Sequence, residues 1–185
     1  MKSCFFETSK EVMRKPPISL VSRYTFLLLL SYAATSIALE SDQSQQVRWS
    51  ADGDSTMRIE ENTRILEMST NVNVTQGTLE IIGNEAIIEL NAATNEFQRV
   101  TVHGTPVHYQ QQLDEDGAIV KGTSETILFY VDSLTEETII ELIGDANIES
   151  PDTTWSCVSI TYIVEQNLIP NSIGPCAGSL SGSNQ

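Results

Sequence analysis

The sequence has few positively charged residues once its first 38 positions are set aside. From residue 39 onward it holds 23 Asp and Glu against only 5 Lys and Arg, a formal charge of −18. A surface of that sign repels nucleic acid and anionic membrane. The composition therefore excludes a function built on a basic patch, and we expect the acidic surface to be solvated.

Residues that commonly carry catalysis or bind metals are also scarce. His103 and His108 are the only histidines, and no Cys or clustered carboxylate lies near them at a zinc-ligand spacing. The acidic stretches 52–54 and 114–117 lack the 12-residue ligand order of a calcium loop. There is no G-x-S-x-G motif, and a glycosidase pair drawn from so many acids would carry no information. We expect no catalytic residues, no metal ligands, no cofactor and no enzyme activity.

A long hydrophobic run is present only near the N-terminus. Phe26–Leu30 follows an n-region with Lys or Arg at positions 2, 10, 14, 15 and 23, and Ser36-Ile37-Ala38 offers small residues for cleavage. This pattern predicts a secretory signal peptide over residues 1–38, with Met13 as an alternative start. The run is shorter than the roughly 20 residues that span a bilayer. An uncleaved membrane anchor remains the alternative.

Cysteine is rare as well, and only Cys157 and Cys176 remain beyond the signal peptide. An even count in an exported protein favours a disulfide, although two free thiols are the alternative. The bridge would close a loop of about 20 residues, which the loop-entropy model values at roughly 3 kcal/mol. Without a C-x-x-C spacing, a redox centre is not expected.

Short segments of alternating apolar and polar residues fill the chain from residue 47 onward. Turn signals such as Asp52-Gly53 and Gln76-Gly77 separate them, and no long window has helical spacing. Alternation with period 2 indicates strands, and many short strands indicate a sandwich, jelly roll or barrel. We predict one β-domain at 47–170, between a flexible N-terminus at 39–46 and a flexible Gly/Ser-rich tail at 171–185.

The strand pattern repeats with an offset of 74 residues. Residues 71–88 align without a gap on residues 145–162, and Gly83 of the first copy is replaced by Cys157 in the second. Hairpins with one apolar face cannot bury that face alone, so the copies must stack or curl on one another. We therefore predict equivalent hairpins that line an apolar interior. The matched apolar pairs are Val72 with Ala146, Val74 with Ile148, Ile81 with Trp155, Ala86 with Ile160 and Ile88 with Tyr162.

Several segments together resemble a known family. Residues 72–81 are similar to its central "NVxVTQGxxxI" segment, and residues 144–146 with 159–164 are similar to its "GNA…KITYLV" elements. Residues 104–107 and 122–124 match its "GKPA" and "GHAS" segments. In order and extent, these motifs resemble the LptA family of lipopolysaccharide-transport proteins, within the OstA-like superfamily.

This resemblance implies an all-β fold, an open V-shaped antiparallel β-jelly roll with an apolar interior groove. It implies a passive periplasmic carrier that shields the lipid A acyl chains of lipopolysaccharide. Its open ends would associate end to end, and with an LptC-like inner-membrane protein and the N-terminal domain of an LptD-like outer-membrane protein, by strand addition. The alternatives are a membrane-anchored LptC-like component, with 24–38 uncleaved, and a β-sandwich module without a lipid groove.

Candidate lipid-contacting residues follow from the resemblance and from the alternation. The family's first-strand "IHI" corresponds to 47–49 and its later "HYEL" strand to 129–131, where a one-residue slip would exchange Phe129 for Tyr130. A purely structural core role is the alternative for every position. We call these residues the interior set: Val47, Trp49, Val72, Val74, Leu79, Ile81, Ala86, Ile88, Phe129, Tyr130, Ile148, Trp155, Ile160 and Tyr162.

Overall fold

The computed structural model describes residues 42, 44–113 and 117–181. The signal peptide predicted at 1–38 lies outside these residues, as do most of the acidic turn at 114–117 and the last four positions. Within the described part of the chain, no helix is long and apolar enough to cross a membrane.

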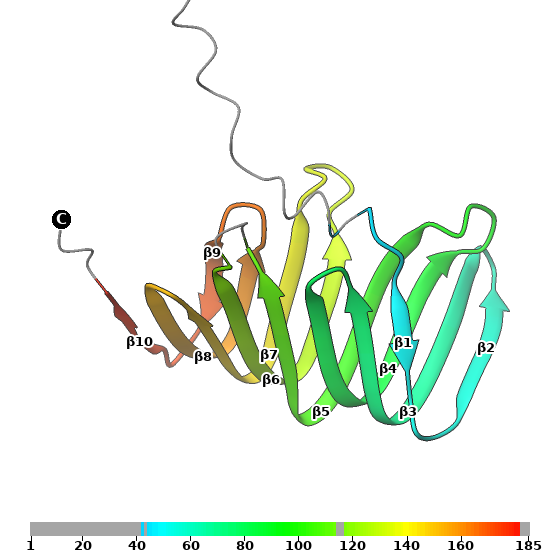
Figure 1. The fold of residues 1–185 in the computed structure, drawn as a ribbon, viewed down its shortest axis with the longest axis horizontal. Coiled ribbons are helices and arrows are strands. Elements are labelled where there is room, and N and C mark those ends of the chain that lie inside the picture. The colour runs from blue at the N-terminus through cyan, green and yellow to red at the C-terminus, as the bar shows by residue number, and fades with distance from the viewer. Residues whose placement is uncertain (1–41, 43, 114–116, 182–185) are drawn as a thin grey trace, which may run out of the picture. The chain divides into compact units, whose positions relative to one another are not determined.

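In the described residues, ten strands form one antiparallel sheet (Figure 1). Strands β3 to β8 pair in sequence order, β1 and β2 both pair with the outer edge of β3, and β9 and β10 both pair with the outer edge of β8. The strands are β1 Arg48–Ser50, β2 Ser55–Glu60, β3 Thr63–Gln76, β4 Leu79–Asn91, β5 Phe97–Gln112, β6 Ile119–Val131, β7 Thr138–Ser150, β8 Thr153–Ile163, β9 Leu168–Ile173 and β10 Ala177–Leu180.

Each long strand is interrupted near its middle, and the interruptions line up across the sheet. The register shifts between Ser69 and Val72 in β3, and comparable shifts follow in β4 to β7. A β-bulge bends its strand, so a line of bulges folds the whole sheet. On one side of this corner the successive paired residues are Ser69, Glu85, His103, Thr126, Ile143 and Ser159.

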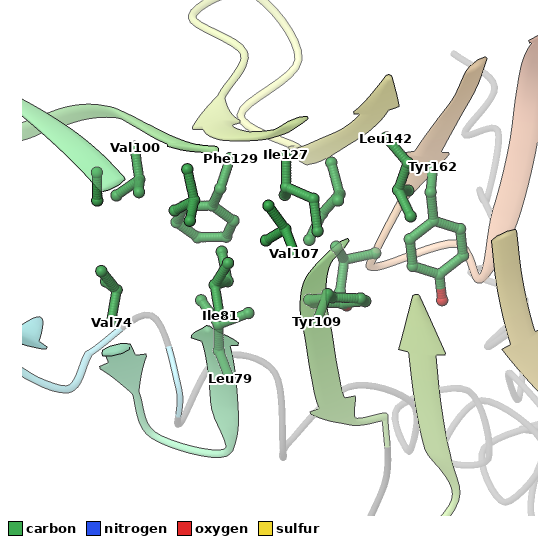
Figure 2. Close-up of a cluster of buried hydrophobic side chains, with 14 of the residues drawn as sticks. Val74, Leu79, Ile81, Val100, Val107, Tyr109, Ile127, Phe129, Leu142 and Tyr162 are labelled. Atoms are coloured by element: carbon green, nitrogen blue, oxygen red, sulfur yellow. The ribbon is translucent and has the colours of Figure 1, made fainter. Parts of the chain in front are cut away.

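The corner divides the sheet into two halves, which we name arm A and arm B. Arm A consists of residues 55–60, 63–69, 85–91, 97–103, 126–131, 138–143 and 159–173, and arm B of residues 48–50, 72–76, 79–82, 107–112, 119–123, 146–150, 153–157 and 177–180. Side chains of the two arms face each other across the interior (Figure 2). The unclosed, folded antiparallel sheet confirms the predicted fold class.

The two copies of the repeat are equivalent hairpins, as predicted. Val72 pairs with Gly83 in β3–β4, and Ala146 pairs with Cys157 in β7–β8, each just past the corner. The agreement extends to the backbone: residues 70 and 71 have φ of 68° and 50°, and residues 144 and 145 have φ of 80° and 48°. The offset of 74 therefore includes the bulges, which neither alternation nor composition had located.

A second repeat appears in the loops at the far edge of arm A. The side-chain oxygen of Asn91 accepts from the N–H groups of Ala93 and Thr94, and that of Asp132 accepts from Leu134 and Thr135. In both loops the first residue also donates its N–H to the carbonyl five positions later. These Asx-type bonds satisfy the backbone where the strand ends.

The C-terminal end differs from the predicted flexible tail. Residues 171–173 lie in β9 and residues 177–180 in β10, both paired with β8. The predicted disulfide between Cys157 and Cys176 is present and holds the connection between these strands to the corner. Turn-forming Gly, Pro and Ser residues suggested disorder, but backbone pairing and the covalent bridge place this segment in the sheet.

Candidate functional site

The interior is lined by two continuous apolar rows, one on each arm. Each row follows the register from strand to strand, so its side chains share one face of the sheet. The arm A row contains Met57, Leu66, Ile88, Val100, Phe129, Ile140 and Tyr162. The arm B row contains Trp49, Val74, Ile81, Tyr109, Gly122, Ile148, Trp155 and Gly178.

The middle of each row is sealed, because the arms pack on each other. Val100 and Ile140 of the arm A row and Val74 and Ile81 of the arm B row are at most 2% exposed. Figure 2 shows Val74, Leu79 and Ile81 from one arm opposite Val100, Ile127 and Phe129 from the other. The interior is thus a packed core at its centre, and an occupant there would have to separate the arms.

Most of the interior set is gathered in this core. Ten of its fourteen residues are buried in the main cluster, and two more, Val47 and Trp155, are half-buried against it. Trp49 shares the face of Val74 but remains 45% exposed at the N-terminal end. The ten are Val72, Val74, Leu79, Ile81, Ala86, Ile88, Phe129, Ile148, Ile160 and Tyr162.

Tyr130 is the one member of the interior set that lies on the opposite face. Phe129 is buried with its ring centroid 5.4 Å from that of Phe97. The Tyr130 hydroxyl instead donates to Glu141 at 2.7 Å, and the Arg99 guanidinium carbon lies 5.5 Å from its ring centroid. Desolvation, followed by the bond to the Glu141 carboxylate, raises the pKa of Tyr130 to about 12. The pairing register therefore places Phe129, and not Tyr130, on the interior face.

Several buried residues of the same faces lie outside the interior set, although Ala146 among them is a matched apolar position of the repeat. The alternations at 100–102 and 107–109 were visible in the sequence and could have identified them. Ile140 and Leu142 lie in the run Thr138–Ile143, which is apolar on both faces and has no readable alternation. The omitted core residues are Leu66, Met68, Val100, Val102, Val107, Tyr109, Val120, Ile127, Ile140, Leu142, Ala146 and Val164.

A polar network lies at the edge of the otherwise apolar interior. The Tyr109 hydroxyl donates to Gln111 at 3.1 Å, and the Gln111 amide donates to Asp42 at 3.2 Å. Thr78 also donates its backbone N–H and its hydroxyl to the Asp42 carboxylate. Burial, reinforced by the nearby Tyr162 and Asp42, raises the pKa of the Tyr109 hydroxyl. The network satisfies a buried carboxylate, which would otherwise be costly.

Both ends of the interior remain accessible. At the C-terminal end, a pocket of about 190 Å³ has Trp155, Tyr162, Leu180, Asn167 and Thr153 in its lining. At the N-terminal end, Met57 and Ile59 on β2 are exposed although Met57 continues the arm A row. The apolar rows therefore reach the surface at the two ends of the sheet.

Gly122 sits in the arm B row at a position where the arms come close. A methyl group added there would lie 2.7 Å from Leu142 Cδ2 and 3.2 Å from Tyr109 Cδ1. Such distances leave no room for a Cβ atom. The glycine therefore lets a Tyr of one arm and a Leu of the other pack against the same stretch of backbone.

These features define a class of protein: a single antiparallel sheet, folded along a line of bulges around an apolar interior with accessible ends. The chain belongs to the family described as LptA/(LptD N-terminal domain) LPS transport protein, whose model matches residues 51–167. This is a family of transport proteins, and membership supports a role in lipopolysaccharide transport.

A solved structure shares the fold. The crystal structure of LptH, the LptA homologous periplasmic component of the conserved lipopolysaccharide transport device from Pseudomonas aeruginosa, matches with a TM-score of 0.59 and 21% identity. The match covers 77% of this chain and 99% of the LptH chain. No curated protein sequence matches the chain.

Proposed function

We propose that the protein is a periplasmic lipopolysaccharide carrier that holds lipid A acyl chains between arm A and arm B. The observation that carries this proposal is the pair of apolar rows, which run from strand to strand across the sheet and reach its surface at both ends. Burying each methylene of an acyl chain yields about 0.8 kcal/mol. A few methylenes therefore suffice for useful affinity.

Loading would separate the arms along the corner. The interior side chains already bury one another, so an acyl chain must replace contacts that the arms now make. Apolar contacts are exchanged for apolar contacts, which keeps the net cost of opening small. The phosphorylated headgroup would stay outside, because the acidic surface offers few cations to pair with it.

The carrier would act as a bridge between membranes. Short exposed strands at both ends of the sheet, β1 and β2 at one and β9 and β10 at the other, present backbone edges for strand addition. Partners would be an LptC-like inner-membrane protein, an LptD-like outer-membrane protein and further copies of this chain. Export would follow cleavage of residues 1–38, and sequencing a free Leu39 N-terminus would exclude a membrane-anchored form.

Photocrosslinking at two adjacent aromatic positions tests the lipid site. Phe129 and Tyr130 lie on opposite faces of β6, so benzoylphenylalanine at each samples the interior and the outer surface in one strand. We expect irradiation with lipopolysaccharide to give an adduct at position 129 and none at position 130. Absence of an adduct at 129 and at the exposed interior-row position Trp49 would refute an interior lipid site and favour a plain sandwich module.

A further inference from the structure

The two ends of the sheet are built alike but are held differently. At each end, two short strands on one edge are joined by a connection across the corner. At the N-terminal end, backbone bonds hold this connection: Gly53 N–H to Ser69 O at 2.9 Å and Ser69 N–H to Asp54 O at 3.1 Å. At the C-terminal end, the Cys157–Cys176 disulfide takes their place.

Strand β10 has little else to keep it in position. All four of its residues are exposed, so it buries no apolar side chain. Pairing with residues 153–156 and a 2.7 Å hydroxyl contact between Thr154 and Ser179 are its remaining ties to β8. Short edge strands held only by backbone pairing fray readily. The disulfide is therefore the contact that keeps β10 on the sheet.

The outer edge of β10 lacks the usual protection against pairing. Edge strands are commonly blunted by charge, proline or a bulge, and β9 has both Pro170 and a nearby register shift. Residues 166–181 contain no charged side chain, although the chain carries an excess of acids. The Ser181 N–H donates inward to Asp152, so by alternation the Leu180 N–H points away from β8. β10 thus offers an open edge.

Strand direction selects the strand that can pair there. Neighbours in the order β1-β3-β4-β5-β6-β7-β8-β10 are antiparallel throughout, so β1 and β10 run in opposite directions. Both strands belong to arm B. A second copy added head to tail would place its β1 antiparallel to β10 and continue the alternation. If β10 were released, β8 would be the terminal strand of arm B. Because β8 runs in the same direction as β1, a β1 strand added there would be parallel and would break the alternation.

Shape favours the same arrangement. The arm B row ends in Trp49 on one side and Gly178 on the other, so an indole would extend the row over a residue without a side chain.

We propose that the Cys157–Cys176 disulfide fixes β10 as the docking strand for β1 of a second copy of this chain. The inference rests on the proposed carrier function, because docking of these strands would join the apolar rows of successive copies. End-to-end association is then conditional on oxidation of this chain's own cysteines. Reduction releases β10 and leaves a terminal strand of the wrong direction.

The test compares the mature oxidised chain with Cys176→Ser and Leu180→Pro by sedimentation velocity across a concentration series. Cys176 is exposed, so its replacement removes the bridge without opening the core. Leu180→Pro keeps the bridge and removes the outward N–H, which an edge strand tolerates. We expect each variant to weaken association at least tenfold, and hydrogen exchange at residues 177–180 to accelerate in Cys176→Ser while β3–β7 stay protected.

Association of either variant at wild-type strength would overturn the inference, and so would a wild-type chain that stays monomeric. Lipopolysaccharide binding is measured in the same samples with dilute, monomeric protein. If the oxidised wild type does not bind lipopolysaccharide, the carrier function is contradicted and the role of β10 is unaffected. Retained binding with unchanged association in Cys176→Ser would contradict only the role of the disulfide.

Discussion

At the scale of single residues, the corner of the sheet imposes the strictest demands. Thr70 and Gly144 occupy equivalent positions of the repeat, and both lie in the left-handed region. Glycine reaches that region without penalty, whereas a β-branched residue is an outlier there. The second copy therefore has the residue that the backbone prefers, and the first copy carries strain at the same point.

We expect Thr70→Gly to stabilise the protein. Relief of the left-handed conformation is worth about 1–2 kcal/mol, and the added freedom of glycine in the unfolded chain takes back about 0.5–1 kcal/mol. The net gain in unfolding free energy should be about 0.5–1 kcal/mol in urea titration. Thr101→Gly, in the regular part of β5, is the control and should destabilise; a loss of stability at both positions would contradict this account of the corner.

At the scale of elements, the fold reuses a hairpin and a loop. The β3–β4 and β7–β8 hairpins share their bulge and their pairing, and the loops after β4 and β6 share their Asx bonds. One loop begins with Asn91 and the other with Asp132, so the amide and the carboxylate fill the same structural role. Only the carboxylate makes the loop sensitive to pH.

The Asp132 loop should make a measurable contribution to pH dependence. Backbone bonds from Thr135 and then Leu134 lower the pKa of Asp132 below its ordinary value. Its contribution is thus present above the unfolded pKa of about 3.9 and is lost as the pH falls through the folded value. Asp132→Asn, copying Asn91, should flatten the unfolding free energy below pH 4 relative to wild type. Parallel pH profiles for the two proteins would show that these bonds do not favour the ionised form.

At the scale of the whole molecule, one sheet provides both walls of the interior. The corner brings arm A over arm B, and residues more than 50 positions apart in sequence, such as Ile81 and Leu142, join one core. In the proposed carrier function, the arms would open along the corner without breaking strand pairing within either arm. Lipid binding would then be coupled to stability.

Lipopolysaccharide should therefore raise the melting temperature. A ligand that binds only the folded state at 100 times its dissociation constant adds about 2.7 kcal/mol, which for a chain of this size shifts Tm by roughly 5–10 °C. Differential scanning fluorimetry with intact lipopolysaccharide should show this shift. The deacylated saccharide is the control and should give none; an equal shift with both would assign binding to the sugar.

The sequence by itself determined the strands, the apolar faces and the equivalence of the two hairpins. Alternation with period 2 depends on local strand geometry and predicts it directly. The repeat at offset 74 then predicts which apolar positions of the two hairpins are equivalent. Ten of the proposed interior residues lie in the core for this reason. The disulfide was also within reach of the sequence, since Cys157 and Cys176 have no other cysteine to pair with beyond residue 38.

Only the tertiary structure decided what depends on register and on contacts between distant strands. Phe129 and Tyr130 look alike in sequence, and pairing with β5 and β7 turns one inward and the other outward. Thr138–Ile143 gives no alternation to read, and the uncharged tail looks disordered until β8 pairs with it. The corner itself depends on bulges aligned across the five strands β3 to β7, because each pair fixes the register of the next.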